Sequence, residues 1–160
     1  MVLRLTLCAC LIAPALLATT ITGPTVSPAT ISFTSPDPDQ TPVNGSSTAT
    51  IQWTMSGNTL GSWSLTVQSV SSSLGSCPAV PASAVSFQCN SATADTLGNA
   101  SCSSGSFSLS TSPQTIASGT RQGAGVSPTT VTISFTFTDA WKYPASSSCS
   151  VQIIYTVTAS

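Results

Sequence analysis

The sequence predicts an all-β fold, a two-sheet antiparallel sandwich of seven to eight short strands, on three observations. Apolar residues alternate with Ser or Thr along much of the chain, which is the period-two pattern of half-buried strands. Turn residues separate the alternating runs at short intervals, as in Asn44-Gly45-Ser46 and Leu97-Gly98-Asn99. No stretch between Thr19 and Ser160 has the 3.6-residue apolar period of a helix, and the abundant Val, Ile and Thr favour strands.

The alternating runs locate the expected strands and their inward faces. We expect strands at 30–33, 49–55, 63–67, 85–89, 107–109, 131–137 and 149–157. Ile154 interrupts the alternation of the last run, which indicates either a bulge or burial on both faces. The Ser-rich stretch 71–81 is interpreted as a loop. The predicted core consists of Ile51, Trp53, Trp63, Leu65, Phe87, Phe107, Ile133, Phe135, Ile153 and Tyr155.

The first 18 residues have the pattern of a secretory signal peptide. Arg4 supplies the positive charge, residues 5–17 are almost wholly apolar, and the small residue Ala18 precedes a change to Thr, Ser, Pro and Gly. The apolar run is shorter than the roughly 20 residues of a membrane span. We expect cleavage after Ala18 and one domain over 19–160, with a lipid-modified Cys10 and an uncleaved anchor as the alternatives. The protein is therefore expected to be secreted, extracellular or on the cell surface.

Charged residues make up only 4% of the chain, against about 25% in a typical soluble domain. The surface must therefore consist largely of Ser, Thr, Asn and Gln, which repel neighbouring molecules weakly. Such a surface suits an exported chain that is glycosylated or packs against copies of itself. Beyond the leader the only cations are Arg121 and Lys142, too few to neutralise a nucleic-acid backbone, so we exclude nucleic acid as a partner.

Four cysteines follow the leader, and an even number in an exported chain predicts two disulfides. The leader itself holds Cys8 and Cys10, which are expected to leave with it. Cys89 and Cys102 flank a Ser/Gly-rich turn and could clamp a hairpin, which leaves Cys77 to reach Cys149. Pairing Cys77 with Cys89 and Cys102 with Cys149 is nearly as favourable. The chain has no CxxC pair and no His, so a metal role for these cysteines is not expected.

Part of the chain resembles bacterial immunoglobulin-like domains. The resemblance is carried by Pro28-Ala-Thr-Ile31-Ser-Phe33, by residues 48–56 (TATIQWTMS) and by Gly61-Ser-Trp63-Ser-Leu65-Thr-Val67. Residues 61–68, with Tyr143 and the final strands, are also similar to WxL-type surface domains, although Trp63-Ser-Leu65 supplies only half of that signature. The cysteines fit neither pattern. The resemblance implies an immunoglobulin-like sandwich and says little about function.

Catalysis is not expected, because the chain has no His and no Glu to act as a general base. Asp37 and Asp39 form the one close carboxylate pair, in a Pro-Asp-Pro-Asp turn that we interpret as a stiff surface loop. Weak Ca²⁺ binding there, with Asn44, is the alternative, and a glycosidase dyad is the remote one. We expect no catalytic residues, no resident metal and no cofactor.

The loop between the last two expected strands is the candidate binding site. Asp139, Trp141, Lys142 and Tyr143 could stack on a sugar ring or anchor a protein partner. Their odd numbering continues the inward face of the preceding strand, which favours the alternative that Trp141 and Tyr143 cap the core. Two glycosylation sequons, at Asn44 and Asn99, are expected in turns.

Two function hypotheses follow from these observations. The first is a non-enzymatic structural or adhesive module of a bacterial cell envelope, a subunit that associates with itself or another protein through exposed edge strands. The second is an extracellular lectin-like domain that binds carbohydrate or protein through the loop around Trp141 and Tyr143.

Overall fold

The computed structural model of the protein describes residues 20–34, 39, 41–56, 61–75, 77–94, 98–121, 127–141, 143 and 149–160. The predicted signal peptide at 1–18 lies outside these residues. The strands of the described residues are β1 (Thr20–Ser27), β2 (Val43–Asn44), β3 (Ala49–Ser56), β4 (Gly61–Ser69), β5 (Ser73–Leu74), β6 (Cys77–Pro81), β7 (Val85–Thr93), β8 (Gly98–Cys102), β9 (Phe107–Ser108), β10 (Gln114–Arg121), β11 (Ser127–Phe137) and β12 (Ile153–Ala159). The predicted all-β class is confirmed, with antiparallel pairing throughout the described sheets.

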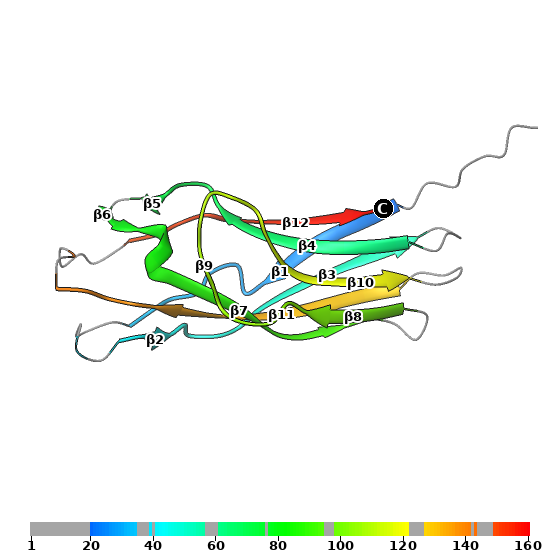
Figure 1. Ribbon diagram of the computed structural model, residues 1–160, viewed down its shortest axis with the longest axis horizontal. Helices are drawn as coiled ribbons and strands as arrows, with labels where there is room; N and C mark the ends of the chain where they lie inside the picture. Colours follow the sequence, from blue (N-terminus) through cyan, green and yellow to red (C-terminus); the bar gives the residue numbers. More distant parts are fainter. Residues whose placement is uncertain are drawn as a thin grey trace, which may run out of the picture.

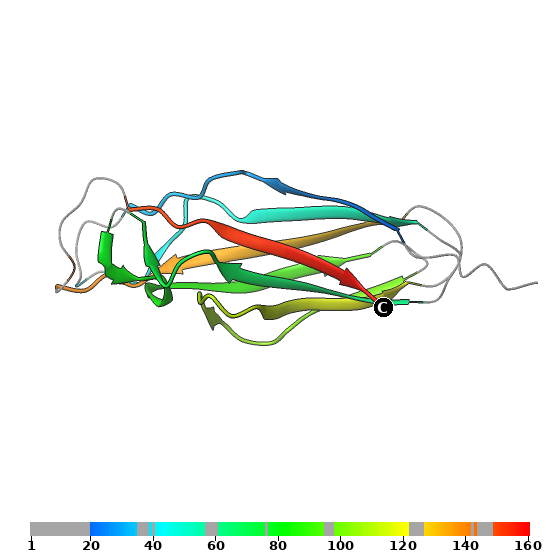
Figure 2. The ribbon, with the colours of Figure 1, turned by 90° about the horizontal axis from the view of Figure 1, so that it is seen from above.

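Two large sheets contain most of these strands (Figures 1 and 2). The first has the order β1-β3-β11-β7-β9, with β2 pairing onto the end of β11 beyond β3. The second has the order β12-β4-β10-β8. The long strands run along the length of an elongated molecule, and β5 and β6 form a small third sheet near one end (Figure 1). No helix of the described residues is long and apolar enough to cross a membrane.

The core lies between the two large sheets, because both contribute their alternate residues to one apolar cluster. Ile51 and Trp53 of β3 and Leu65 of β4 are at most 1% exposed. Trp53 and Trp63, from opposite sheets, are in direct ring contact. Of the predicted core, Phe107, Ile153 and Tyr155 are only partly buried, while the other seven residues are buried.

Two disulfides join the four cysteines as Cys77–Cys149 and Cys89–Cys102. The alternative pairing is therefore not the one formed. Cys89 lies on β7 and Cys102 on β8, which belong to different sheets, so this bond ties the sheets together rather than clamping a hairpin. Cys77 on β6 holds the residues that precede β12, where Gly75 also donates its N–H to the Ser150 carbonyl (2.7 Å).

Three local expectations were wrong. Residues 30–33 are not a strand: Ser32 accepts from the Ser46 N–H and donates to the Ser46 hydroxyl, and the first strand of the sheet is β1. The Ser-rich stretch 71–81 is not only loop, since β5 and β6 pair within it. Ile154 marks neither a bulge nor a doubly buried position, because β12 pairs with β4 in unbroken register and Ile154 is 40% exposed.

Strand β10 had no expected counterpart, and its geometry explains why. A bulge between Thr115 and Ala117 places Ile116 and Ala117, adjacent in sequence, both in the core. Two consecutive buried residues break the period-two pattern on which the expectation rested.

Candidate functional site

The site lies along the side of the sandwich where β1 and β12, the end strands of the two sheets, approach one another. We call this side the β1/β12 seam: residues 26–33, which are the end of β1 and the segment after it, residues 149–159, which are β12 and the segment before it, and the side chains between them. It is the side opposite the Cys89–Cys102 bond, which joins β7 and β8. The seam consists of the backbone edge of β12 and a groove beneath it.

The pairing of β12 with β4 fixes which of its backbone groups remain outside the sheet. Ser62 and Ser160 exchange both backbone hydrogen bonds (2.9 and 3.0 Å), and Val70 donates to the carbonyl of Gln152 (3.0 Å). The even-numbered residues of β12 therefore direct their N–H and C=O groups at β4. Ile153, Tyr155 and Val157 direct theirs away from it, and no strand of the described residues pairs with this edge.

Along a strand both the N–H direction and the side-chain direction alternate with a period of two residues. Ile153, Tyr155 and Val157, whose N–H groups point away from β4, therefore share one side-chain direction, which is toward the core. Ile153, Tyr155 and Val157 pack against the main core but are only partly buried. Ile154 points to the outer face of the sheet. The edge thus combines unpaired backbone groups with apolar side chains that a neighbouring strand would cover.

A groove of about 1130 Å³ follows the seam. Its walls are mainly apolar side chains of the two sheets and of the segments that follow β1 and precede β12. They are Val26, Ile31, Phe33, Phe135, Phe137, Val151, Ile153 and Tyr155. Phe33 and Phe137 contact across it, with ring centroids 5.8 Å apart. Several of these residues belong to the core cluster yet are not fully buried, so the sandwich is incompletely covered along this side.

Tyr155 shows how far the groove is shielded from water. Burial raises the pKa of its phenol from 10.0 to about 12, because the charged phenolate loses solvation among apolar neighbours. A neutral phenol with a hydroxyl suits the wall of an apolar groove that also offers a hydrogen bond.

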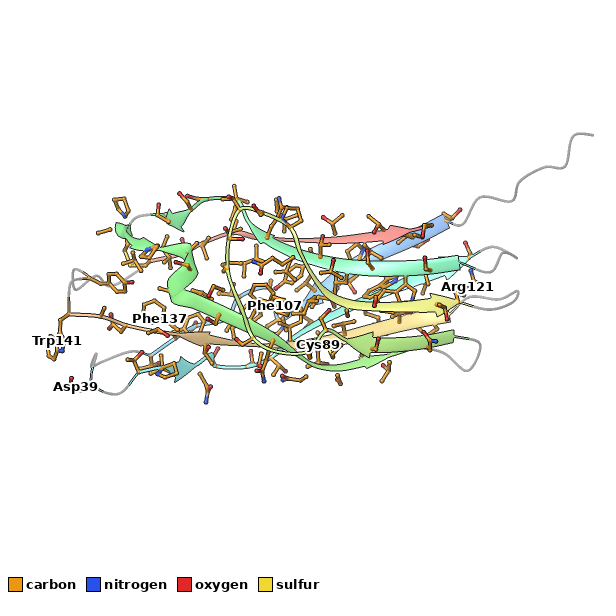
Figure 3. All side chains as sticks on the ribbon, viewed as in Figure 1. Asp39, Cys89, Phe107, Arg121, Phe137 and Trp141 are labelled. Carbon is orange, nitrogen blue, oxygen red and sulfur yellow. A yellow bond between two sulfur atoms is a disulfide. The ribbon has the colours of Figure 1, made fainter. Side chains whose placement is uncertain are left out.

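The predicted binding loop lies at one end of this groove. Asp139, Trp141 and Tyr143 are among its lining residues, and Trp141 is 74% exposed at the end of the molecule (Figure 3). Trp141 thus does not cap the core, whereas Tyr143 packs against the small cluster around Leu74. Lys142 lies outside the described residues.

The turn that presents Trp141 is fixed by hydrogen bonds. The Asp139 N–H donates to the Thr41 hydroxyl (2.8 Å), and the Asp139 carboxylate accepts from the Ala140 N–H (2.7 Å). Tyr143 donates its N–H to the carbonyl of Ala140 (2.8 Å). An exposed indole on an ordered turn is the geometry of a stacking or anchoring residue.

The remaining sequence-based candidates have simpler positions. Asp39 is exposed near the same end as Trp141 (Figure 3), and Asp37 lies outside the described residues. No group of three or more potential metal ligands occurs among the residues that the structure describes. The sequon residues Asn44 and Asn99 are exposed but lie in β2 and β8 rather than in turns, and Asn99 accepts a hydrogen bond from the Thr120 N–H (2.9 Å).

The chain matches no protein family, no curated protein and no solved structure with which it was compared. Its own geometry is therefore the basis for a functional proposal. The open edge of β12 could not be identified from the sequence, because which strand ends a sheet depends on pairing between distant segments. The lack of any charge from 149 to 160 was the one available signal, since protected edges usually carry charge or proline.

Proposed function

We propose that this protein is an exported, non-enzymatic structural or adhesive module of the bacterial cell surface that assembles with other protein chains by adding a strand to β12. The observation that carries this is the seam itself: an edge of β12 that no strand of the described residues pairs with, directly beside an incompletely covered apolar groove. Addition of a strand to an exposed sheet edge is a recurrent mode of protein recognition, in which backbone bonds give affinity and side-chain pockets give specificity.

Two further features support the extracellular, immunoglobulin-like part of this proposal. Two disulfides are typical of an oxidising compartment and agree with the signal-peptide pattern at 1–18. In the first sheet β1 pairs with β3, the next long strand, as strands A and B pair in the A-B-E-D sheet of immunoglobulin domains. The absence of His and Glu from the sequence favours a role without catalysis.

The proposal is tested by the mass of the purified protein in light scattering, from dilute to concentrated solution. We expect growth of the mass with concentration, and loss of that growth in Ile154→Lys, because a lysine on an edge strand disfavours pairing with another chain. Gln52→Lys is the matched control: Gln52 is exposed on β3, whose two edges are both paired. A wild-type protein that stays monomeric throughout contradicts assembly with itself, and association retained by Ile154→Lys contradicts the use of β12.

A second candidate function, carbohydrate binding, is favoured by the exposure of Trp141 on its ordered turn. Aromatic rings on a binding surface stack against sugar rings. A glycan array screened with the wild-type protein and with Trp141→Ala tests it. Selective binding that the variant loses supports the lectin function, and equal or absent signals from both proteins remove it.

A further inference from the structure

The edges of the two sheets differ in how far they are protected against pairing. β1 contains Pro24, which has no N–H to donate, Pro28 follows its last residue, and its register with β3 shifts between Thr22 and Thr25. β9 is only two residues long. β8 is five residues long and is tied by Cys102 to the other sheet. Proline, irregular register and short length are the devices that keep natural edge strands from pairing with other chains.

β12 has none of these devices. Its seven residues, Ile153–Ala159, include no proline and no charge, and its register with β4 is unbroken over its whole length. The N–H and C=O groups of β12 that point away from β4 recur at every second residue. The edge can therefore pair with any strand whose outward backbone groups have the same spacing. A second copy of the same edge meets this requirement automatically.

We infer that β12 pairs antiparallel with β12 of a second copy, about a two-fold axis at Thr156, so that the four-stranded sheets of the two molecules become continuous. This inference rests on the proposed function and names its partner. The register follows from the strand: full overlap of residues 153–159 with themselves, in antiparallel sense, places residue 156 opposite its own copy. The outward groups of Tyr155 then meet those of Val157 in the second copy, which makes a hydrogen-bonded pair.

The side chains agree with this register on both faces. On the inner face Tyr155 lies opposite Val157 of the second copy, an aromatic and β-branched pair of the kind that stabilises sheets. On the outer face the two Thr156 residues lie opposite each other, and Ile154 lies opposite Thr158. Because 149–160 carries no charge, the two copies meet without like-charge repulsion. Tyr155 and Val157, partly exposed in the single chain, gain cover.

Single cysteines on the outer face of β12 test the register. In the inferred dimer the two residues 156 form a non-hydrogen-bonded pair with Cα atoms about 4.5 Å apart, within the roughly 7 Å limit for a disulfide. Residue 158 lies opposite residue 154, so the two residues 158 are separated by four residues, about 14 Å along the strands. Thr156→Cys should therefore form a covalent dimer under mild oxidation, whereas Thr158→Cys and Ile154→Cys alone should not.

Mixing Thr158→Cys with Ile154→Cys should restore a covalent dimer, which is the matched positive control for the same strand. Mass mapping of the non-reduced protein confirms that the new disulfide joins the introduced positions and that the two native ones are intact. If the wild-type protein associates in light scattering but Thr156→Cys does not crosslink, or Thr158→Cys alone crosslinks as well, the inferred pairing of β12 with β12 in this register is wrong while assembly stands. A monomeric wild-type protein without any crosslink overturns this inference and assembly of the protein with itself.

Discussion

The indole rings of Trp53 and Trp63 meet edge to face across the sandwich, with centroids 5.0 Å apart and planes at 75°. Trp53 lies on β3 and Trp63 on β4, so this contact joins the two sheets. Both indole nitrogens are buried and have no hydrogen-bond partner among the described residues. The pair therefore acts through packing, and its energy is measurable by substitution.

Replacing either tryptophan with alanine should lower the free energy of unfolding by about 3–5 kcal/mol, because a large buried side chain leaves a cavity. Trp53→Phe should cost less, since it retains much of the ring and removes a buried N–H that has no partner. Chemical denaturation of Trp53→Ala, Trp63→Ala and the double variant gives the coupling between the rings, expected at about 0.5–1.5 kcal/mol. Additive effects of the two substitutions would contradict direct ring contact.

Gly119 of β10 is expected to tolerate no side chain. A Cβ there would overlap the carbonyl oxygen of Asn99 and lie 2.7 Å from the Trp63 ring. Gly119→Ala should therefore destabilise the protein by about 1–3 kcal/mol through overpacking. The neighbouring Ser118 is exposed, and Ser118→Ala should change the stability by no more than about 0.5 kcal/mol. Thermal unfolding of the two variants side by side makes the comparison, and equal melting temperatures would refute it.

The two disulfides should contribute unequally to stability. Cys77–Cys149 closes a separation of 72 residues and Cys89–Cys102 one of 13. The chain-entropy argument gives about 4.4 kcal/mol for the longer loop and about 2.9 kcal/mol for the shorter. Denaturation midpoints of the paired Cys→Ser variants should follow that order. The reverse order would mean that tying the two sheets matters more than loop length.

Stability should fall in strongly alkaline solution because of Tyr155. Its pKa is raised from 10.0 to about 12, so the folded state binds the phenolic proton more tightly than the unfolded state does. This contribution is fully present below pH 10 and is lost as the pH rises from 10 to 12. Its size is of the order of 2–3 kcal/mol. Urea unfolding of wild type and Tyr155→Phe across this range measures it, since the variant should lack this component of the decline.

The sequence predicted the fold class and most of the core because regular, half-buried strands leave a period-two pattern. Ile51 and Leu65 are buried as expected, on central strands whose neighbours lie on both sides. The pattern was lost where geometry departs from regularity, as at the bulge beside Ile116. It also could not distinguish a covered inward face from an open one, so Ile153 and Tyr155 were expected to be fully in the core.

The binding loop shows the same limit. Odd numbering indicated that Trp141 continues the inward face, but β11 ends at Phe137, and the hydrogen bond from the Tyr143 N–H to the Ala140 carbonyl places residue 141 within a turn. Once a strand has ended, the alternation of side chains no longer holds. Trp141 consequently points to solvent, while Tyr143 still reaches an apolar neighbour in the cluster around Leu74.

The Cys89–Cys102 bond is a covalent link between the two sheets on the side of the sandwich away from the seam. That link joins β7 to β8, while at the β1/β12 seam the Cys77–Cys149 bond holds the residues that precede β12. Beyond Cys149 no disulfide of the described residues reaches β12, so this side of the sandwich is held by side-chain packing and by the pairing of β12 with β4.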